Sequence, residues 1–420
     1  MKERRYRDRP RAAWCCVGLL TLAMLGPGAA MAEDDAPSFF IETITVESER
    51  LSPEIVISES LLREGREYSE TELREAVHRI NRLPFVLLAE FSLRKGSERG
   101  RFELVVQVQE TRRWFFRLGL AYEFNDPFDR FQLAGEVDDR FRAEDDDLDA
   151  LVGRRFAIGS RGLLFASFGT EDGLFAIGYQ RYNLWNRNIL FSVTLAGDGG
   201  GDAVDESRSV RAQLGIPLRG NHALRLLTGW NEDRVRFFFA EGGFDVRQSE
   251  AEIAWVFNSR DDPVLPRQGK LFEAGVTWSE IEDNRLTVRP DGSFSRIEVS
   301  ERQQGLIGTA ARHWPVGNRQ SVSAGIGGFV GDSFGRSQLL EVEANVGHQV
   351  FLLRNLEPGK WRELRFETQL TALRQEFSSG DPEFGLPRAL NGSRLRAGLT
   401  YRSGWGLFRM VFDYAERDFE

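Results

Sequence analysis

The chain has 420 residues, 41% of them hydrophobic, and a formal net charge of −9. This composition is that of a globular protein of two or three units, and beyond the N-terminal segment no run of about 18 apolar residues predicts a membrane-spanning helix. Because the charge balance is acidic, we expect no nucleic-acid partner, since phosphate binding needs a basic face. Membrane spans built from β-strands remain possible, because they need only alternating segments of about 10 residues.

The N-terminal segment, residues 1–32, has the pattern of a secretory signal. A basic start precedes the apolar stretch CCVGLLTLAML, and the small residues of AMA come before the acidic EDDAP. We therefore expect a signal peptide over 1–32 and an exported chain that begins near Glu33. Both cysteines, Cys15 and Cys16, lie inside this segment, so the exported chain is expected to carry no disulfide and no zinc–thiolate site. Removing six basic and two acidic residues leaves 49 against 62, a net charge of about −13.

Residues 33–112 predict a small α+β domain. FFIETITVES alternates as a strand, and SPEIVISESLLREG predicts a short helix that ends at Gly65. A second helix starts at a capping box of Ser69 and Glu72, and the segments LLAEFSLRKG and RFELVVQVQE predict two further strands. The expected order is β-α-α-β-β. We expect His78, on the second helix, at the solvated surface.

This element order, together with the phrases LLREGREYSETEL, INRLPFV and FELVVQVQE, resembles a POTRA domain, the polypeptide-transport-associated module of outer-membrane assembly and secretion proteins. Another small α+β fold is the alternative. The resemblance implies a sheet whose second strand lies at an open edge, where an extended client can add as a further strand. The expected client-pairing strand consists of Leu88, Ala89, Glu90, Phe91, Ser92 and Leu93.

Residues 113–420 show period-two alternation and no sustained helical periodicity. In RRWFFRLGLAYEF one face is aromatic and the other is charged or small, and aromatic residues recur at strand ends. A soluble sandwich also alternates, but a membrane barrel places aromatic residues at both interfaces and charged residues inside. We therefore expect a mainly β protein: a 16-stranded antiparallel transmembrane β-barrel, with 113–124 as the first strand, 130–141 as the second and 405–415 as the last.

One phrase in this half carries a motif, WVFNSRDDPVLPRQGKLFEAGVTW over 255–278. Prolines and a glycine end the pairing and fix a reversal, and the first Arg and Asp can pair at the strand end. The phrase resembles the barrel signature of the BamA/TamA-type superfamily of outer-membrane assembly and translocation proteins. The residues that match it are Arg260, Asp261, Asp262, Pro263, Pro266, Arg267 and Gly269. The chain departs from that family in two respects: the Arg-Gly-aromatic tip of the inward-folded loop is not found in the sequence, and the usual terminal aromatic residue, here Phe419, lies one residue from the end.

Charged residues of both signs alternate with apolar residues in the C-terminal strands, so they are expected to face the barrel lumen. They either line a channel or pair with one another and close it. The expected lumen charges are Glu341, Glu343, Glu363, Arg365, Glu367, Arg394, Arg396, Arg409 and Asp413.

The resemblance implies an outer-membrane protein assembly or polypeptide translocation factor, with the POTRA domain in the periplasm of a Gram-negative bacterium. Its expected partners are outer-membrane lipid, extended polypeptide clients and periplasmic assembly partners, and the barrel is expected to be a monomer. The alternative is a passive pore or structural barrel without insertase activity. We expect no enzyme, no cofactor and no metal site, because His222, His313 and His348 show neither metal-ligand nor nucleophile-elbow spacing.

Overall fold

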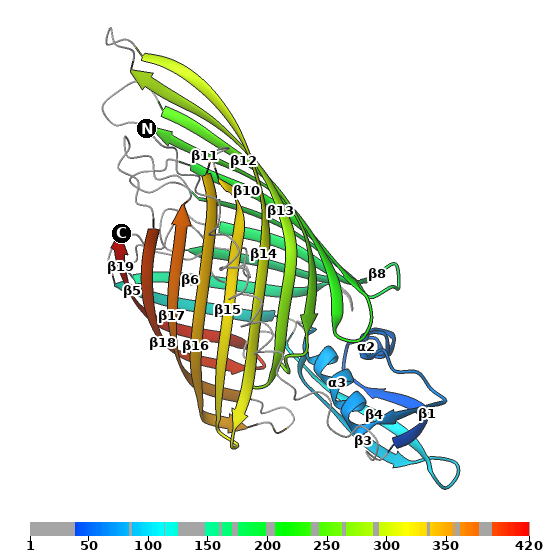
Figure 1. The fold of residues 1–420 in the computed structure, drawn as a ribbon. Coiled ribbons are helices and arrows are strands. Elements are labelled where there is room, and N and C mark those ends of the chain that lie inside the picture. Colours follow the sequence, from blue (N-terminus) through cyan, green and yellow to red (C-terminus); the bar gives the residue numbers. More distant parts are fainter. Residues whose placement is uncertain are drawn as a thin grey trace, which may run out of the picture.

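The computed structural model describes the chain in fourteen segments. They are residues 38–83, 86–112, 114–124, 148–158, 162–169, 175–198, 206–236, 243–262, 266–288, 294–333, 337–355, 357, 362–377 and 389–419. The signal-peptide segment lies outside them. The prediction of a mainly β protein is confirmed: a small unit with two helices adjoins one end of a long barrel of strands (Figure 1). Among the described residues, no helix is long and apolar enough to cross a membrane.

The N-terminal unit, residues 38–110, is a four-stranded sheet with two helices. Its strands have the order β2-β1-β4-β3; β1 pairs antiparallel with β2 and parallel with β4. The elements are β1 (Ser38–Glu47), α2 (Pro53–Ser60), β2 (Arg66–Ser69), α3 (Glu70–Asn81), β3 (Val86–Lys95) and β4 (Arg101–Glu110). The predicted β-α-α-β-β order was incomplete, because the short strand β2 fits the sheet by backbone pairing although it has too few residues to show a period.

Local sequence sets both helices. Helix α2 has proline in its first turn and ends at Ser60, where Leu61 adopts a left-handed conformation with φ of 59°. The expected end at Gly65 was therefore wrong. Helix α3 begins at the predicted capping box: the Glu72 N–H donates to Ser69 Oγ at 3.2 Å, and the Ser69 N–H donates to the Glu72 carboxylate at 2.7 Å.

The core of this unit includes residues of the barrel. Ile41, Leu73 and Leu104 are each at most 1% exposed, as expected where helices cover one face of a sheet. Leu163 belongs to the same buried cluster, and Tyr182 packs against it, although both come from barrel strands. The N-terminal unit is thus packed onto the barrel through apolar contacts. We call the end of the barrel that adjoins it the proximal end.

The barrel consists of antiparallel neighbours in chain order. Its strands are β5 (Trp114–Phe124), β6 (Leu148–Ile158), β7 (Gly162–Gly169), β8 (Phe175–Leu184), β9 (Ile189–Asp198), β10 (Glu206–Pro217), β11 (His222–Arg236), β12 (Gly243–Asn258), β13 (Gly269–Val288), β14 (Phe294–Val316), β15 (Gln320–Ser333), β16 (Ser337–Asn355), β17 (Arg362–Phe377), β18 (Ala389–Ser403) and β19 (Gly406–Phe419). The last strand, β19, pairs with β5 in parallel and closes the ring.

The described residues contain fifteen of the sixteen expected barrel strands. The remaining one, 130–141, lies outside the described residues, so the count of sixteen stays a prediction. With fifteen alternating strands the first and the last run in the same direction, and the ladder from Gly406↔Phe116 to Tyr414↔Phe124 is accordingly parallel.

The two faces of the barrel differ as the alternation predicts. On β17, Phe366 and Leu370 are 39% and 51% exposed on the outer face, whereas Glu363 and Arg365 are each 3% exposed on the inner face. Strand length varies around the ring, from 8 residues in β7 to 23 in β14. The longest strands, β13 and β14, extend away from the N-terminal unit (Figure 1).

Candidate functional site

The sequence motif forms the turn between β12 and β13, which we call the motif turn (residues 259–268). Gly269 has φ of +110°, and a Cβ there would lie 2.4 Å from the Ser259 carbonyl oxygen, so only glycine fits. Asp261 accepts the backbone N–H groups of Arg267 at 2.9 Å and Gln268 at 3.2 Å, which holds the reversal. The side chain of Arg260 donates to Asn258 Oδ1 at 3.2 Å.

The motif contains two prolines, and the structure describes one of them. Pro266 is buried, as suits a residue that ends strand pairing against the barrel wall. Pro263 lies outside the described residues.

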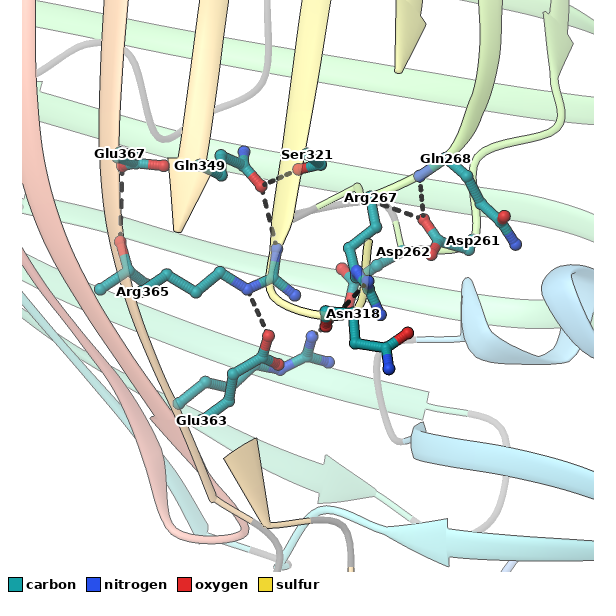
Figure 2. A network of polar contacts seen from close by, with 12 residues as sticks. Asp261, Asp262, Arg267, Gln268, Asn318, Ser321, Gln349, Glu363, Arg365 and Glu367 are labelled. Atoms are coloured by element: carbon teal, nitrogen blue, oxygen red, sulfur yellow. Dashed lines mark hydrogen bonds and ion pairs between the residues drawn. The ribbon is translucent and has the colours of Figure 1, made fainter. Parts of the chain in front are cut away.

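The motif turn reaches across the interior of the barrel to strands on the far side. Asp262 forms an ion pair with Arg402 of β18, and four strands separate β13 from β18 in the ring. Arg267 donates to the carbonyl oxygens of Gly317 at 3.4 Å and Asn318 at 3.2 Å, in the turn between β14 and β15 (Figure 2). The motif therefore ties distant parts of the proximal rim together.

Guanidinium groups gather around an aromatic ring on β16. The Cζ atoms of Arg267 and Arg365 are 4.7 Å and 4.3 Å from the centroid of the Phe351 ring. Arg365 also donates to Glu363 and, at 3.2 Å, to Gln349, so a polar network continues inside the barrel (Figure 2). Phe351 is 2% exposed, so the ring is almost fully covered by its neighbours on the inner face.

Most of the expected lumen charges are engaged with one another on the inner face. Their closest contacts, besides Arg365 with Glu363, are Arg396 with Asp413 at 2.9 Å, Arg409 with Glu367 at 2.8 Å, and Gln375 Nε2 with Glu341 at 2.8 Å. Glu343 and Arg394 lie at inward positions of β16 and β18 by the alternation of the strands. Of the two alternatives left open by the sequence, this arrangement favours mutual pairing.

A second group of inward charges, which the sequence patterns did not single out, lies on β11, β12 and β13. Arg225 of β11 pairs with Glu252 of β12, at 2.6 Å, and with Glu273 of β13. A signal was present, because the three residues occupy alternating, inward positions of three consecutive predicted strands. Cross-strand opposite charges of this kind stabilise a sheet.

The N-terminal unit contacts the barrel beside the motif turn, through the end of α3. Arg82 donates to the backbone oxygen of Asn258, the last residue of β12, and at 3.3 Å to the side chain of Asn221. Ser58 of α2 donates its hydroxyl to Asn188 Oδ1, in the turn between β8 and β9, and Asn188 Nδ2 donates to the Ser58 carbonyl oxygen. These contacts place the helices of the unit directly against the turns of the barrel.

The polar groups at this contact are electrostatically perturbed. Burial lowers the pKa of Arg82 to about 10, with the Glu59 carboxylate opposing the change, and Arg82 stays protonated at neutral pH. Burial likewise raises the pKa of Glu59, against the attraction of Arg82 and Arg79. Burial lowers the pKa of His78, while the nearby Asp261 carboxylate acts in the opposite direction. His78 is half-buried and faces the motif turn, so its expected place at the solvated surface was wrong.

Asp261 itself is perturbed by the same environment. Burial raises the pKa of its carboxyl group, and the N–H donors of Gln268 and Arg267 limit the rise. A buried carboxylate held by two backbone donors is compatible with a structural role in the turn.

The expected client-pairing strand lies within β3, at one edge of the N-terminal sheet. Within the described residues β3 pairs with β4 alone, so its second edge has no strand beside it. Glu90 and Ser92 are exposed, whereas Ala89 is 2% exposed in the core. The opposite edge is β2, which has 4 residues against 10 in β3 and offers a much shorter template.

The segment that links the N-terminal unit to the barrel is fixed at the junction of β19 and β5. The Arg112 N–H donates to the Gly404 carbonyl oxygen at 3.0 Å, and its guanidinium lies 3.2 Å from the centroid of the Trp405 ring. The Phe116 N–H donates to the Trp405 carbonyl oxygen at 2.9 Å. The turn between the last two strands is therefore held by the linker.

No family model matches the chain, and no curated protein matches it. The chain resembles two solved structures. One is BamA from Haemophilus ducreyi lacking POTRA domains 1–3, at 11% identity and a TM-score of 0.42, with 90% of this chain and 85% of that chain covered. The other is CdiB from Acinetobacter baumannii, at 11% identity and a TM-score of 0.46, with 87% and 70% covered. Since both identities are 11% and both TM-scores lie below 0.5, these two structures carry no argument about the function of this chain.

Proposed function

We propose that this protein is an outer-membrane factor for protein assembly or polypeptide translocation, in which the N-terminal unit captures extended clients in the periplasm and the barrel assists their entry into the membrane. The observation that carries the proposal is the connection of an open strand edge, β3, to the barrel through α3, beside the motif turn. The BamA/TamA-type signature in the sequence agrees with this role.

The capture step is supported by the geometry of β3. Its unpaired edge presents backbone donors and acceptors over ten residues, and an extended segment can satisfy them by adding as a strand. Recognition by backbone hydrogen bonds is tolerant of client sequence, which suits a factor with many clients.

The membrane assignment is supported by the outer face of the barrel. Large apolar side chains are exposed there on strand after strand, and a soluble protein rarely exposes such a continuous surface. Examples from separate parts of the ring are Ile177 at 43%, Ile253 at 45%, Leu306 at 47%, Val346 at 54%, Leu395 at 52% and Phe412 at 45%. Hydrocarbon is the solvent that suits this band.

Site-specific photocrosslinking in cells tests the capture step. A photoreactive residue in place of Ser92 on β3 is expected to crosslink nascent outer-membrane polypeptides, and the same residue in place of Glu67 on β2 serves as the control at the other edge. Because β2 is short, we expect few crosslinks there. Equal crosslinking at both positions, or none at Ser92, contradicts edge capture.

The second candidate is a passive pore or structural barrel, and the missing Arg-Gly-aromatic tip in the sequence favours it. The paired lumen charges oppose an open channel, because ion pairs among Arg365, Arg396 and Arg409 and their partners occupy the interior. Conductance in planar bilayers separates the two functions. A large steady conductance that survives deletion of residues 39–110 supports the pore.

A further inference from the structure

The outer faces of β13 and β14 carry two contrasting charge pairs. At the end far from the N-terminal unit, Glu280 lies opposite Arg302 and the two form an ion pair at 3.0 Å. At the proximal end of the same two strands and on the same face, Lys270 lies directly opposite Arg312. Like charges directly opposite one another destabilise a sheet, so this second pair calls for a compensating anion.

No acidic side chain of the described residues supplies that anion. Lys270 and Arg312 share the outward face of their strands with apolar side chains, whereas the nearby Glu273 points inward and is paired with Arg225. Both cations are partly exposed. The guanidinium of Arg312 lies 5.1 Å from the centroid of the Trp314 ring, which keeps it at the surface of the barrel wall.

An aromatic cluster lies on the same outer face, beside this pair. His222 and Trp255 have ring centroids 5.5 Å apart, and Phe257 and Phe272 have centroids 5.9 Å apart. Phe272 is two residues from Lys270, so it shares the outward face of β13. Aromatic side chains at this level of a membrane barrel mark the boundary between hydrocarbon and headgroups. Basic side chains just beyond such a boundary reach headgroup phosphates.

We propose that Lys270, Arg312 and Trp314 form a binding site for the phosphate of an anionic glycerophospholipid, whose acyl chains lie along the neighbouring apolar strands. The proposal rests on the membrane assignment made above, because it needs the proximal end to face a phospholipid leaflet. The side chains of Lys270 and Arg312 bind one phosphate group, and the indole of Trp314 covers the glycerol region. The ion pair of Glu280 and Arg302 at the other end needs no such ligand.

Native mass spectrometry of the detergent-solubilised full chain tests the site, with dioleoyl phosphatidylglycerol as the probe. Each cation near a phosphate contributes about fivefold in affinity, so the double variant Lys270→Gln/Arg312→Gln should bind this lipid about 25-fold more weakly. The charge-preserving variant Lys270→Arg/Arg312→Lys should bind it as the unaltered protein does. Arg302→Gln, on the same strands and face, is the matched control and should have no effect.

Several outcomes overturn the proposal. Unchanged lipid binding in the Lys270→Gln/Arg312→Gln variant does so, as does an equal loss in the Arg302→Gln control, or binding of dioleoylglycerol as tight as that of the phospholipid. Competition by inorganic phosphate at the concentration of the lipid also overturns it, since it reassigns the site to the free anion. Heat-modifiable migration on gels confirms that each variant is folded. Client crosslinking at Ser92 is measured separately, so failure of the proposed function is distinguishable from failure of this site.

Discussion

Arg402 of β18 forms an ion pair with Asp262 of the motif turn across 140 residues of sequence and across the interior of the barrel. Their side chains are only 10% and 20% exposed, so the charges are largely removed from water. Such a pair is costly to break from one side, because the remaining charge stays desolvated. The contact makes the motif turn a cross-brace of the proximal end.

Removing either charge of this brace should loosen the proximal end. We expect Arg402→Gln or Asp262→Asn to lower the free energy of unfolding by about 2 to 3 kcal/mol and to raise conductance in planar bilayers. The swapped variant Arg402→Asp/Asp262→Arg should reverse part of both changes, the lower stability and the higher conductance. Urea unfolding in detergent micelles and single-channel recording measure the two effects. A swapped variant no better than the single ones rules out a direct pair.

Gly269 should tolerate no side chain. In Gly269→Ala the added Cβ meets the Ser259 carbonyl oxygen at 2.4 Å and the backbone has φ of +110°, so we expect a loss of about 3 kcal/mol or failure to fold. Gly308→Ala on β14 is the control, because its nearest neighbour would be 3.9 Å away. The yield of heat-modifiable barrel is the measurement. Equal yields from both variants contradict the steric argument.

The docking of the N-terminal unit should depend on the guanidinium of Arg82. Arg82→Gln removes hydrogen bonds to Asn258 and Asn221, and a charge-assisted hydrogen bond contributes about 2 kcal/mol. We expect faster hydrogen exchange in α3 and at the end of β12, measured by mass spectrometry. Arg82→Lys should not restore protection, since a single ammonium group lacks the fork that reaches both acceptors.

A second arginine provides the control for this experiment. Arg99 is exposed in the hairpin between β3 and β4, so Arg99→Gln removes the same charge without a contact to the barrel. Exchange in α3 should then be unchanged. Protection that falls equally in both variants assigns the effect to net charge.

Docking should also weaken as the pH falls from 7.5 to 5.5. Burial lowers the pKa of His78 below its ordinary 6.5, so the undocked form binds a proton that the docked form does not. The stabilisation is therefore present above pH 6.5 and is lost as the pH falls through the lowered pKa, by up to about 1 kcal/mol. Hydrogen exchange of α3 against pH measures it, and His78→Gln should remove the dependence.

Asp261 acts in the opposite direction. Because burial raises the pKa of its carboxyl group above 3.8, its contribution to stability is fully present below 3.8 and is lost as the pH rises through the raised value. Asp261→Asn retains an oxygen acceptor for Arg267 and Gln268 and removes this dependence. If the change between pH 7.5 and 5.5 persists in His78→Gln and disappears in Asp261→Asn, the assignment to His78 is wrong.

Much of the architecture was predictable because it depends on local patterns. The capping box of Ser69 and Glu72 fixed the start of α3, and period-two alternation placed the barrel strands and the inward charges. The short strand β2 was missed, since four residues show no period and their pairing with β1 is a tertiary contact. The end of α2 was missed because Leu61, a residue that seldom adopts positive φ, takes the left-handed position.

The candidate site was predictable only as a motif. The sequence marked Asp262 and Gly269, but it held no sign that Asp262 reaches Arg402 or that Arg267 stacks on Phe351, because these contacts depend on how a closed ring brings distant strands together. The half-buried position of His78 was likewise set by the packing of α3 on the barrel. Such long-range partners follow from closure and packing, which no local pattern records.

The parallel ladder between β19 and β5 limits what can be inserted there. Both edges run away from the N-terminal unit, so a single guest strand entering between them from the opposite direction is antiparallel to each and restores strict alternation around the ring. A guest hairpin leaves one parallel contact wherever it enters. For the proposed function, a client with an odd number of strands therefore matches the strand directions at this junction better than a client with an even number.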